Sequence, residues 1–161
     1  YVASGPVVYR FNRATQQWAS FATWSTTVTG LEVYDGKLWV ALGDSTNMQQ
    51  FNGSAWSAVA GRQYTHLLAA GGYLNALKAL GGSDKLGYFN GSAWTDLGCG
   101  TADHTFTGMA WYRDTLIVFS ALEALSHTGQ YSVRVIDYRQ MRSARNGRQA
   151  TICCAKSVRT A

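Results

Sequence analysis

The chain has 161 residues, of which 47% are hydrophobic and only 14% are charged, and its formal net charge is +5. This length is enough for one domain with a sizeable core, and no apolar run reaches the roughly 18 residues that a membrane-spanning helix needs. The 17 glycines, nine tyrosines and six tryptophans, with one proline, favour an all-β protein, because aromatic residues suit pleated surfaces and glycine suits tight turns.

The sequence contains four similar segments, which we call repeat units. The first of them, about residues 1–24, begins inside a strand pattern. Residues 1–5 read Tyr-Val-Ala-Ser-Gly and align with residues 39–43, Trp-Val-Ala-Leu-Gly, in the second strand of the next unit. We therefore expect the first unit to lack the strand that comes first in the other units, which would be the innermost strand if the units are stacked radially.

The second unit, about residues 25–61, predicts an antiparallel meander. Asp35-Gly36 and Asn52-Gly53 mark two tight hairpin turns, since these dipeptides supply the positive φ that such turns require. A longer loop joins the middle strands. The four strands are expected at roughly 30–34, 38–42, 47–51 and 55–59.

Two further units follow, at about residues 62–100 and 101–138. Gly71-Gly72 and Asn90-Gly91 stand at the turn positions of the third unit, and 132–138 reads as the third strand of the fourth. The spacing of three tryptophans supports the repeat, because Trp18, Trp56 and Trp94 are 38 residues apart.

A lone four-stranded meander cannot bury both of its faces, so we expect the units to stack radially as about 3.5 blades of a β-propeller. Trp18, Trp56 and Trp94 are predicted to pack between blades, since a buried tryptophan covers about 150–250 Å². The turn glycines with a structural role are Gly36, Gly53, Gly72 and Gly91. Such a ring must protect its sheet edges, and closure could come from the C-terminal tail, from a longer parent chain or from several chains.

The recurring segments resemble a known family. Phe51-Asn-Gly-Ser-Ala-Trp56 and Phe89-Asn-Gly-Ser-Ala-Trp94, with the Phe11 and Trp18 pair, are similar to kelch-like β-propeller repeats, in the short form found in bacterial surface and phage tail proteins. The resemblance covers residues 1 to about 138, although the period is shorter than in kelch repeats. It implies a propeller that binds a partner, and it implies no reaction.

Residues 139–161 are expected to form a basic tail of unknown structure. Residues 134–161 hold seven basic residues against Asp137, which is typical of a solvated terminus. Nucleic acid is not expected as a partner outside this tail. Cys99, Cys153 and Cys154 have no zinc spacing, so no metal is predicted.

No catalytic motif is visible, so we predict a protein that is not an enzyme and uses no cofactor. The loops at one end of the meanders are longer and more varied than the hairpin turns at the other, and varied loops on a rigid scaffold are typical of binding sites. The candidate contact residues in these loops are Trp24, Asp44, Arg62, Tyr64, Asp84, Asp103 and His104.

The sequence thus favours a non-catalytic binding or structural module of a larger assembly, of the virion, phage-tail or cell-surface type. Its partners are expected to be other protein subunits, with glycans as a second class, and its location extracellular or in a virion. Two alternatives stay open: a lectin-like propeller that binds carbohydrate, and an intracellular kelch-like adaptor.

Overall fold

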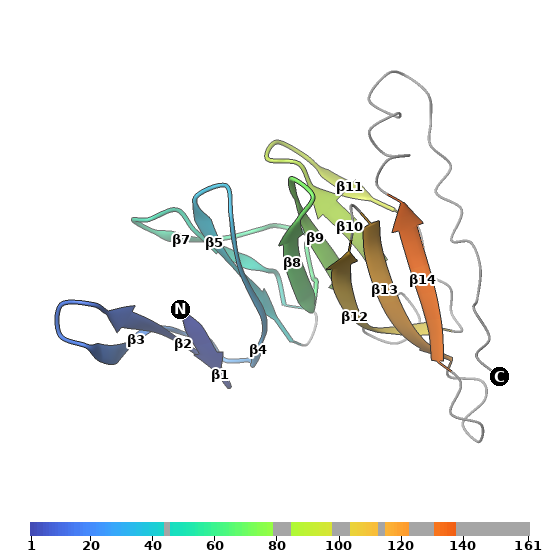
Figure 1. Ribbon diagram of the computed structural model, residues 1–161. Coiled ribbons are helices and arrows are strands. Elements are labelled where there is room, and N and C mark those ends of the chain that lie inside the picture. Colours follow the sequence, from blue (N-terminus) through green and yellow to red (C-terminus); the bar gives the residue numbers. More distant parts are fainter. Residues whose placement is uncertain (44–45, 79–84, 98–103, 113–114, 123–130, 138–161) are drawn as a thin grey trace. The chain divides into compact units, whose positions relative to one another are not determined.

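The computed structural model describes residues 1–43, 46–78, 85–97, 104–112, 115–122 and 131–137 (Figure 1). These residues form fourteen β-strands and no helix, so the all-β prediction is confirmed. Accordingly, this part of the chain holds no helix that is long and apolar enough to cross a membrane. The chain divides into two compact units, Tyr1–Leu67 and Leu68–Ala161.

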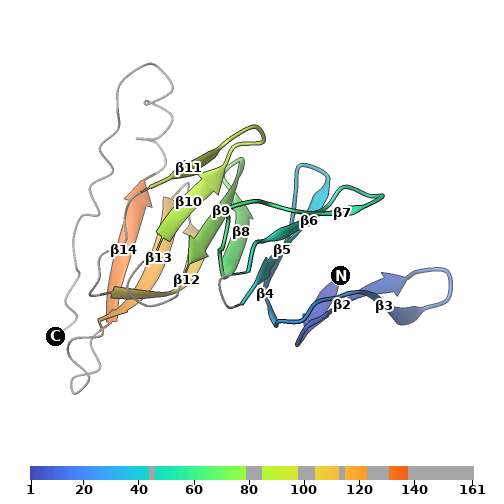
Figure 2. The same ribbon diagram turned by 180° about the vertical axis from the view of Figure 1, so that it is seen from behind.

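The strands form four antiparallel sheets, each with its strands in chain order (Figures 1 and 2). The first sheet contains β1 (Val2–Ser4), β2 (Val7–Asn12) and β3 (Gln17–Thr23). The second contains β4 (Val28–Tyr34), β5 (Lys37–Leu42), β6 (Gln49–Phe51) and β7 (Trp56–Ala58). The third contains β8 (His66–Ala70), β9 (Tyr73–Lys78), β10 (Lys85–Phe89) and β11 (Trp94–Asp96). The fourth contains β12 (His104–Tyr112), β13 (Thr115–Leu122) and β14 (Tyr131–Asp137).

The second sheet has its four strands within two residues of the predicted bounds. The first sheet has three strands, and none of them corresponds to β4 of the second sheet, in agreement with the expected lack of an innermost strand. The basic tail at 139–161 lies outside the described residues.

Two kinds of local chemistry form the turns. Gly36, Gly53, Gly72 and Gly91 have φ values of 69°, 99°, 81° and 96°, a region that glycine enters without steric cost. Asn52 Oδ1 accepts hydrogen bonds of 2.9 Å from the backbone N–H groups of both Ser54 and Ala55. Asn90 accepts the equivalent pair from Ser92 and Ala93, so each Asn-Gly-Ser segment is an Asx turn.

The core of the first unit lies between the first and second sheets. Val8 on β2 and Val40 on β5 are 0% exposed and belong to one cluster with Leu38 and Leu42. Trp56 packs against this cluster and contacts Phe21 of β3, with ring centroids 5.8 Å apart. Trp56 therefore joins the two sheets of this unit, the role predicted for the repeated tryptophans.

Trp18 corrects the prediction that all three repeated tryptophans are buried between sheets. It pairs with Phe11 at a centroid distance of 5.2 Å, as Trp56 pairs with Phe51 at the same distance, yet Trp18 is 54% exposed. The reason is positional. Phe11 and Trp18 lie opposite each other on the first sheet, on the face turned away from Val8, which packs against the second sheet.

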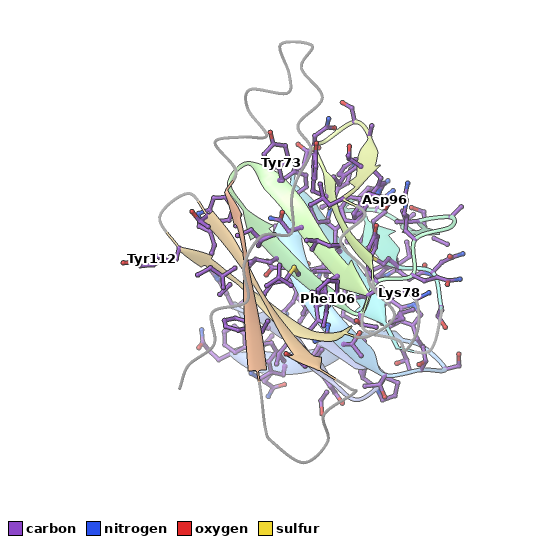
Figure 3. The ribbon with its side chains drawn as sticks, turned by 90° about the vertical axis from the view of Figure 1, so that its right-hand side faces the viewer. Tyr73, Lys78, Asp96, Phe106 and Tyr112 are labelled. Atoms are coloured by element: carbon purple, nitrogen blue, oxygen red, sulfur yellow. The ribbon has the colours of Figure 1, made fainter. Side chains whose placement is uncertain are left out.

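The core of the second unit lies between the third and fourth sheets. Tyr73, Leu77 and Leu86 of the third sheet form one buried cluster with residues of the fourth, which are Phe106, Leu116 and Val118. Phe106 lies in the interior of the unit, whereas Tyr112 projects outward from the end of β12 (Figure 3). Trp94 is half-buried and pairs with Phe89 at 5.3 Å.

Candidate functional site at the loop end

Antiparallel strands alternate in direction, so the connections of a meander alternate between its two ends. In the first unit, the turns at 13–16, 35–36 and 52–55 lie at one end, here named the turn end. The other connections define the loop end, whose described residues are 5–6, 24–27, 43, 46–48 and 59–65.

Backbone hydrogen bonds tie the first loops of this end together. Trp24 N donates to Pro6 O at 3.0 Å, Val28 N to Gly5 O at 2.9 Å, and Gly43 N to Thr27 O at 2.9 Å. The segment 24–28 is thus held between the β1–β2 connection and the end of β5. The exposed side chains of Ser25 and Thr27 are presented on a fixed backbone.

A second set of bonds places Arg62. Met48 N donates to Arg62 O at 2.8 Å, and Val59 N donates to Met48 O at 2.8 Å. Arg62 N completes a turn by donating to Val59 O at 3.2 Å. Arg62 is half-buried, and it is the one charged residue among the described residues of the loop end.

Two predicted contact residues pack against other side chains, Tyr64 fully and Trp24 in part. Tyr64 is only 2% exposed, and Trp24 packs edge-on against Trp56 with centroids 4.9 Å apart. Both sit at loop positions, but burying a large aromatic surface is worth more than exposing it. Tyr64 therefore forms no part of the surface of the loop end, whereas Trp24 remains half-buried there.

The remaining candidates are not brought to one described site. Asp44, Asp84 and Asp103 lie outside the described residues. His104 is the first residue of β12 and pairs with Leu122, so its backbone belongs to a strand and not to the predicted loop. Among the predicted contact residues that the structure describes, Arg62 and Trp24 lie at the loop end and are half-buried.

Asn47 was not among the predicted contact residues, because the residue pattern assigned it to a strand. Among the residues that the structure describes, its Oδ1 is the buried side-chain oxygen without a hydrogen-bond partner. A buried acceptor without a donor costs roughly 1–3 kcal/mol. Asn47 lies in the loop that begins at Gly43, so this unpaired acceptor belongs to the loop end.

His66 was also outside the predicted contact set. It is half-buried at the start of β8, and its Nδ1 lies 3.0 Å from Thr65 Oγ1. Burial lowers the pKa of His66, because desolvation penalises the charged imidazolium.

Stability is expected to depend on this group near neutral pH. Unfolded histidine titrates near pH 6.5, so below that pH the unfolded state takes up the proton more readily than the folded state. The contribution of His66 to the free energy of unfolding should be largest above about pH 6.5 and should fall as the pH decreases below that value. Chemical denaturation at a series of pH values measures this slope. His66→Gln should flatten it, and an unchanged slope in that variant would assign the effect to other groups.

Within the described residues, no group of three or more His, Cys, Asp or Glu side chains could hold a metal ion. The described surface of the loop end is instead mostly neutral and polar. Comparison of the chain with protein-family models and with curated proteins finds no match.

Proposed function

We propose that the chain is a non-catalytic module of β-propeller type, with about three and a half four-stranded blades, that contacts protein subunits of a larger assembly through its loop end. Its location in this proposal is extracellular or in a virion. Support comes first from the repeated sheet geometry. Leu38 pairs with Phe51 in the second sheet, and Leu74 pairs with Phe89 in the third, so one register recurs in both.

The observation that carries the binding role is the difference between the two ends of the first unit. The turn end consists of hairpins closed by their own Asn and Gly residues. The loop end combines a backbone fixed by hydrogen bonds between loops with exposed Ser25 and Thr27. A surface whose backbone is already ordered loses little entropy when a partner binds.

Site-specific photo-crosslinking in cells that produce the chain tests this function. A benzoylphenylalanine replacing Ser25 at the loop end is expected to give a discrete crosslinked protein. The matched control replaces Ser54, which is exposed at the turn end, and should give none. Equal products from both positions, or no product from either, would contradict a partner-binding role for the loop end.

A lectin-like role is the second candidate, and Asn47 is the observation that favours it. Its Oδ1 has no hydrogen-bond partner, so opening of the loop would offer an acceptor to a sugar hydroxyl, and Arg62 is anchored to the same loop through Met48. A glycan array probed with the purified chain separates the two roles. Under this alternative Arg62→Ala should weaken glycan binding about tenfold or more, the usual cost of losing a hydrogen bond to a charged group.

A further inference from the structure

The two described pairs of sheets stack in the same way. In the first unit, Leu38 and Val40 of the second sheet pack against Val8 of the first. In the second unit, Leu116 and Val118 of the fourth sheet pack against Leu77 of the third. Leu38 and Leu116 hold the same repeat position, because each follows an apolar residue, Leu31 or Met109, by seven residues.

The first sheet has a face that matches the packed face of the second sheet. We name it the Trp18 face, and its members are Val2, Tyr9, Phe11 and Trp18, which share one side because they pair across the strands. The corresponding residues of the second sheet are Val40, Gln49, Phe51 and Trp56. Trp56 is packed against a neighbouring sheet, whereas Val2 is 46% and Trp18 is 54% exposed.

The fourth sheet has the complementary face. Phe119 occupies the repeat position of Leu77, three residues after Leu116 as Leu77 follows Leu74. Leu77 is 0% exposed and packs against the following sheet, whereas Phe119 is 40% exposed. Its side of the sheet, named the Phe119 face, also carries Ile117 and Tyr112, and Tyr112 is 57% exposed.

These two faces hold most of the large apolar side chains that the described surface exposes. Six such residues are exposed, and four of them are Val2, Trp18, Tyr112 and Phe119. The named members of both faces are uncharged, and on the fourth sheet the charged residue that the register places on the side of Phe119 is Asp137, which pairs with Thr115 at the end of the strands. Exposed apolar patches of this kind are typical of protein–protein interfaces.

We infer that two copies of the chain associate head to tail, with the Phe119 face of one copy packed on the Trp18 face of the next. The contact would continue the sheet-on-sheet packing seen within each unit. Phe119 of one copy would pack against the first sheet of the next copy, as Leu77 of the third sheet packs against the fourth. Such an interface is heterologous, so it either closes into a ring or extends as a filament. The association concerns the assembly proposed above and rests on that function, but it uses surfaces other than the loop end.

Sedimentation velocity of the 161-residue chain over a wide concentration series tests the association. Wild type should self-associate, and Trp18→Glu should weaken association about 30-fold or more, as expected for a central aromatic contact. The control is Val33→Glu, because Val33 is 60% exposed and lies outside both faces. A wild-type chain that stays monomeric throughout, or a Trp18→Glu variant that associates like wild type, would overturn the inference.

A mixing experiment adds a readout that misfolding cannot imitate. Trp18→Glu and Phe119→Glu should each be monomeric alone, but their mixture should form a dimer, because each variant retains one intact face of a heterologous pair. No dimer in the mixture would exclude head-to-tail pairing. Loop-end crosslinking from Ser25 is a separate measurement on a separate surface, so failure of the association leaves the proposed function standing, and the two failures are distinguishable.

Discussion

Trp56→Ala is expected to lower the free energy of unfolding by about 3 kcal/mol, whereas Trp18→Ala should change it by less than about 0.5 kcal/mol. Both residues hold the same repeat position, and each pairs with a phenylalanine at 5.2 Å. Trp56 also contacts Phe21 and Trp24, so its removal opens a cavity between two sheets. Trp18 is 54% exposed, and its removal opens none.

Urea denaturation of both variants, at a concentration where the chain is monomeric, measures the difference. Trp18→Ala is the matched control, because the residue type and the cross-strand neighbour are the same in both positions. Equal losses of stability in the two variants would mean that the intrasheet phenylalanine pair, and not the packing between sheets, supplies the stabilisation by Trp56.

Gly71→Ala is expected to destabilise the chain by about 2 kcal/mol more than Gly72→Ala. Both glycines have positive φ, 63° and 81°, so both substitutions bear a backbone cost of roughly 1–2 kcal/mol. A Cβ on Gly71 would also overlap the Trp111 ring, lying 2.7 Å from Cζ2, whereas a Cβ on Gly72 would meet no atom within 4 Å.

Thermal and urea denaturation of the two variants measure the extra cost. The double variant Gly71→Ala with Trp111→Leu tests its cause, because a smaller side chain at 111 leaves room for the added methyl group. The two substitutions should then be less destabilising together than the sum of their separate effects. Strict additivity would show that the Trp111 ring is not the obstacle.

One repeat position shows why some core residues escaped prediction. Trp39 and Asn75 both follow the equivalent leucines, Leu38 and Leu74, and both are almost fully buried. Trp39 Nε1 donates to Tyr34 O at 3.1 Å, and Asn75 Nδ2 donates to Ala70 O at 3.2 Å. Each carbonyl lies five residues earlier, at the end of the first strand of its sheet. Two unlike side chains thus donate to the backbone carbonyl at the equivalent position of each sheet. A pattern of residue types does not reveal this shared role.

Residue patterns alone predict the class of the fold and the positions of its turns. Alternation, the 38-residue spacing of three tryptophans and the Asn-Gly and Gly-Gly pairs act over a few residues. Local backbone preferences therefore predict the meander of the second sheet and the glycines with positive φ. The one charged residue at the described loop end, Arg62, was predicted in the same way, because loop position follows from the turns on either side.

Which side chains are buried follows from the stacking of the sheets and not from the local pattern. Trp18 and Trp56 look identical in the repeat, and they differ because one lies on an outward face and the other faces Phe21 and Trp24. Tyr64 and Trp24 look like loop-surface residues, yet they are packed. Burial depends on what covers a side chain, and the covering residues are distant in sequence. Local patterns carry no information about them, so the surface available for binding emerges only when the sheets are stacked.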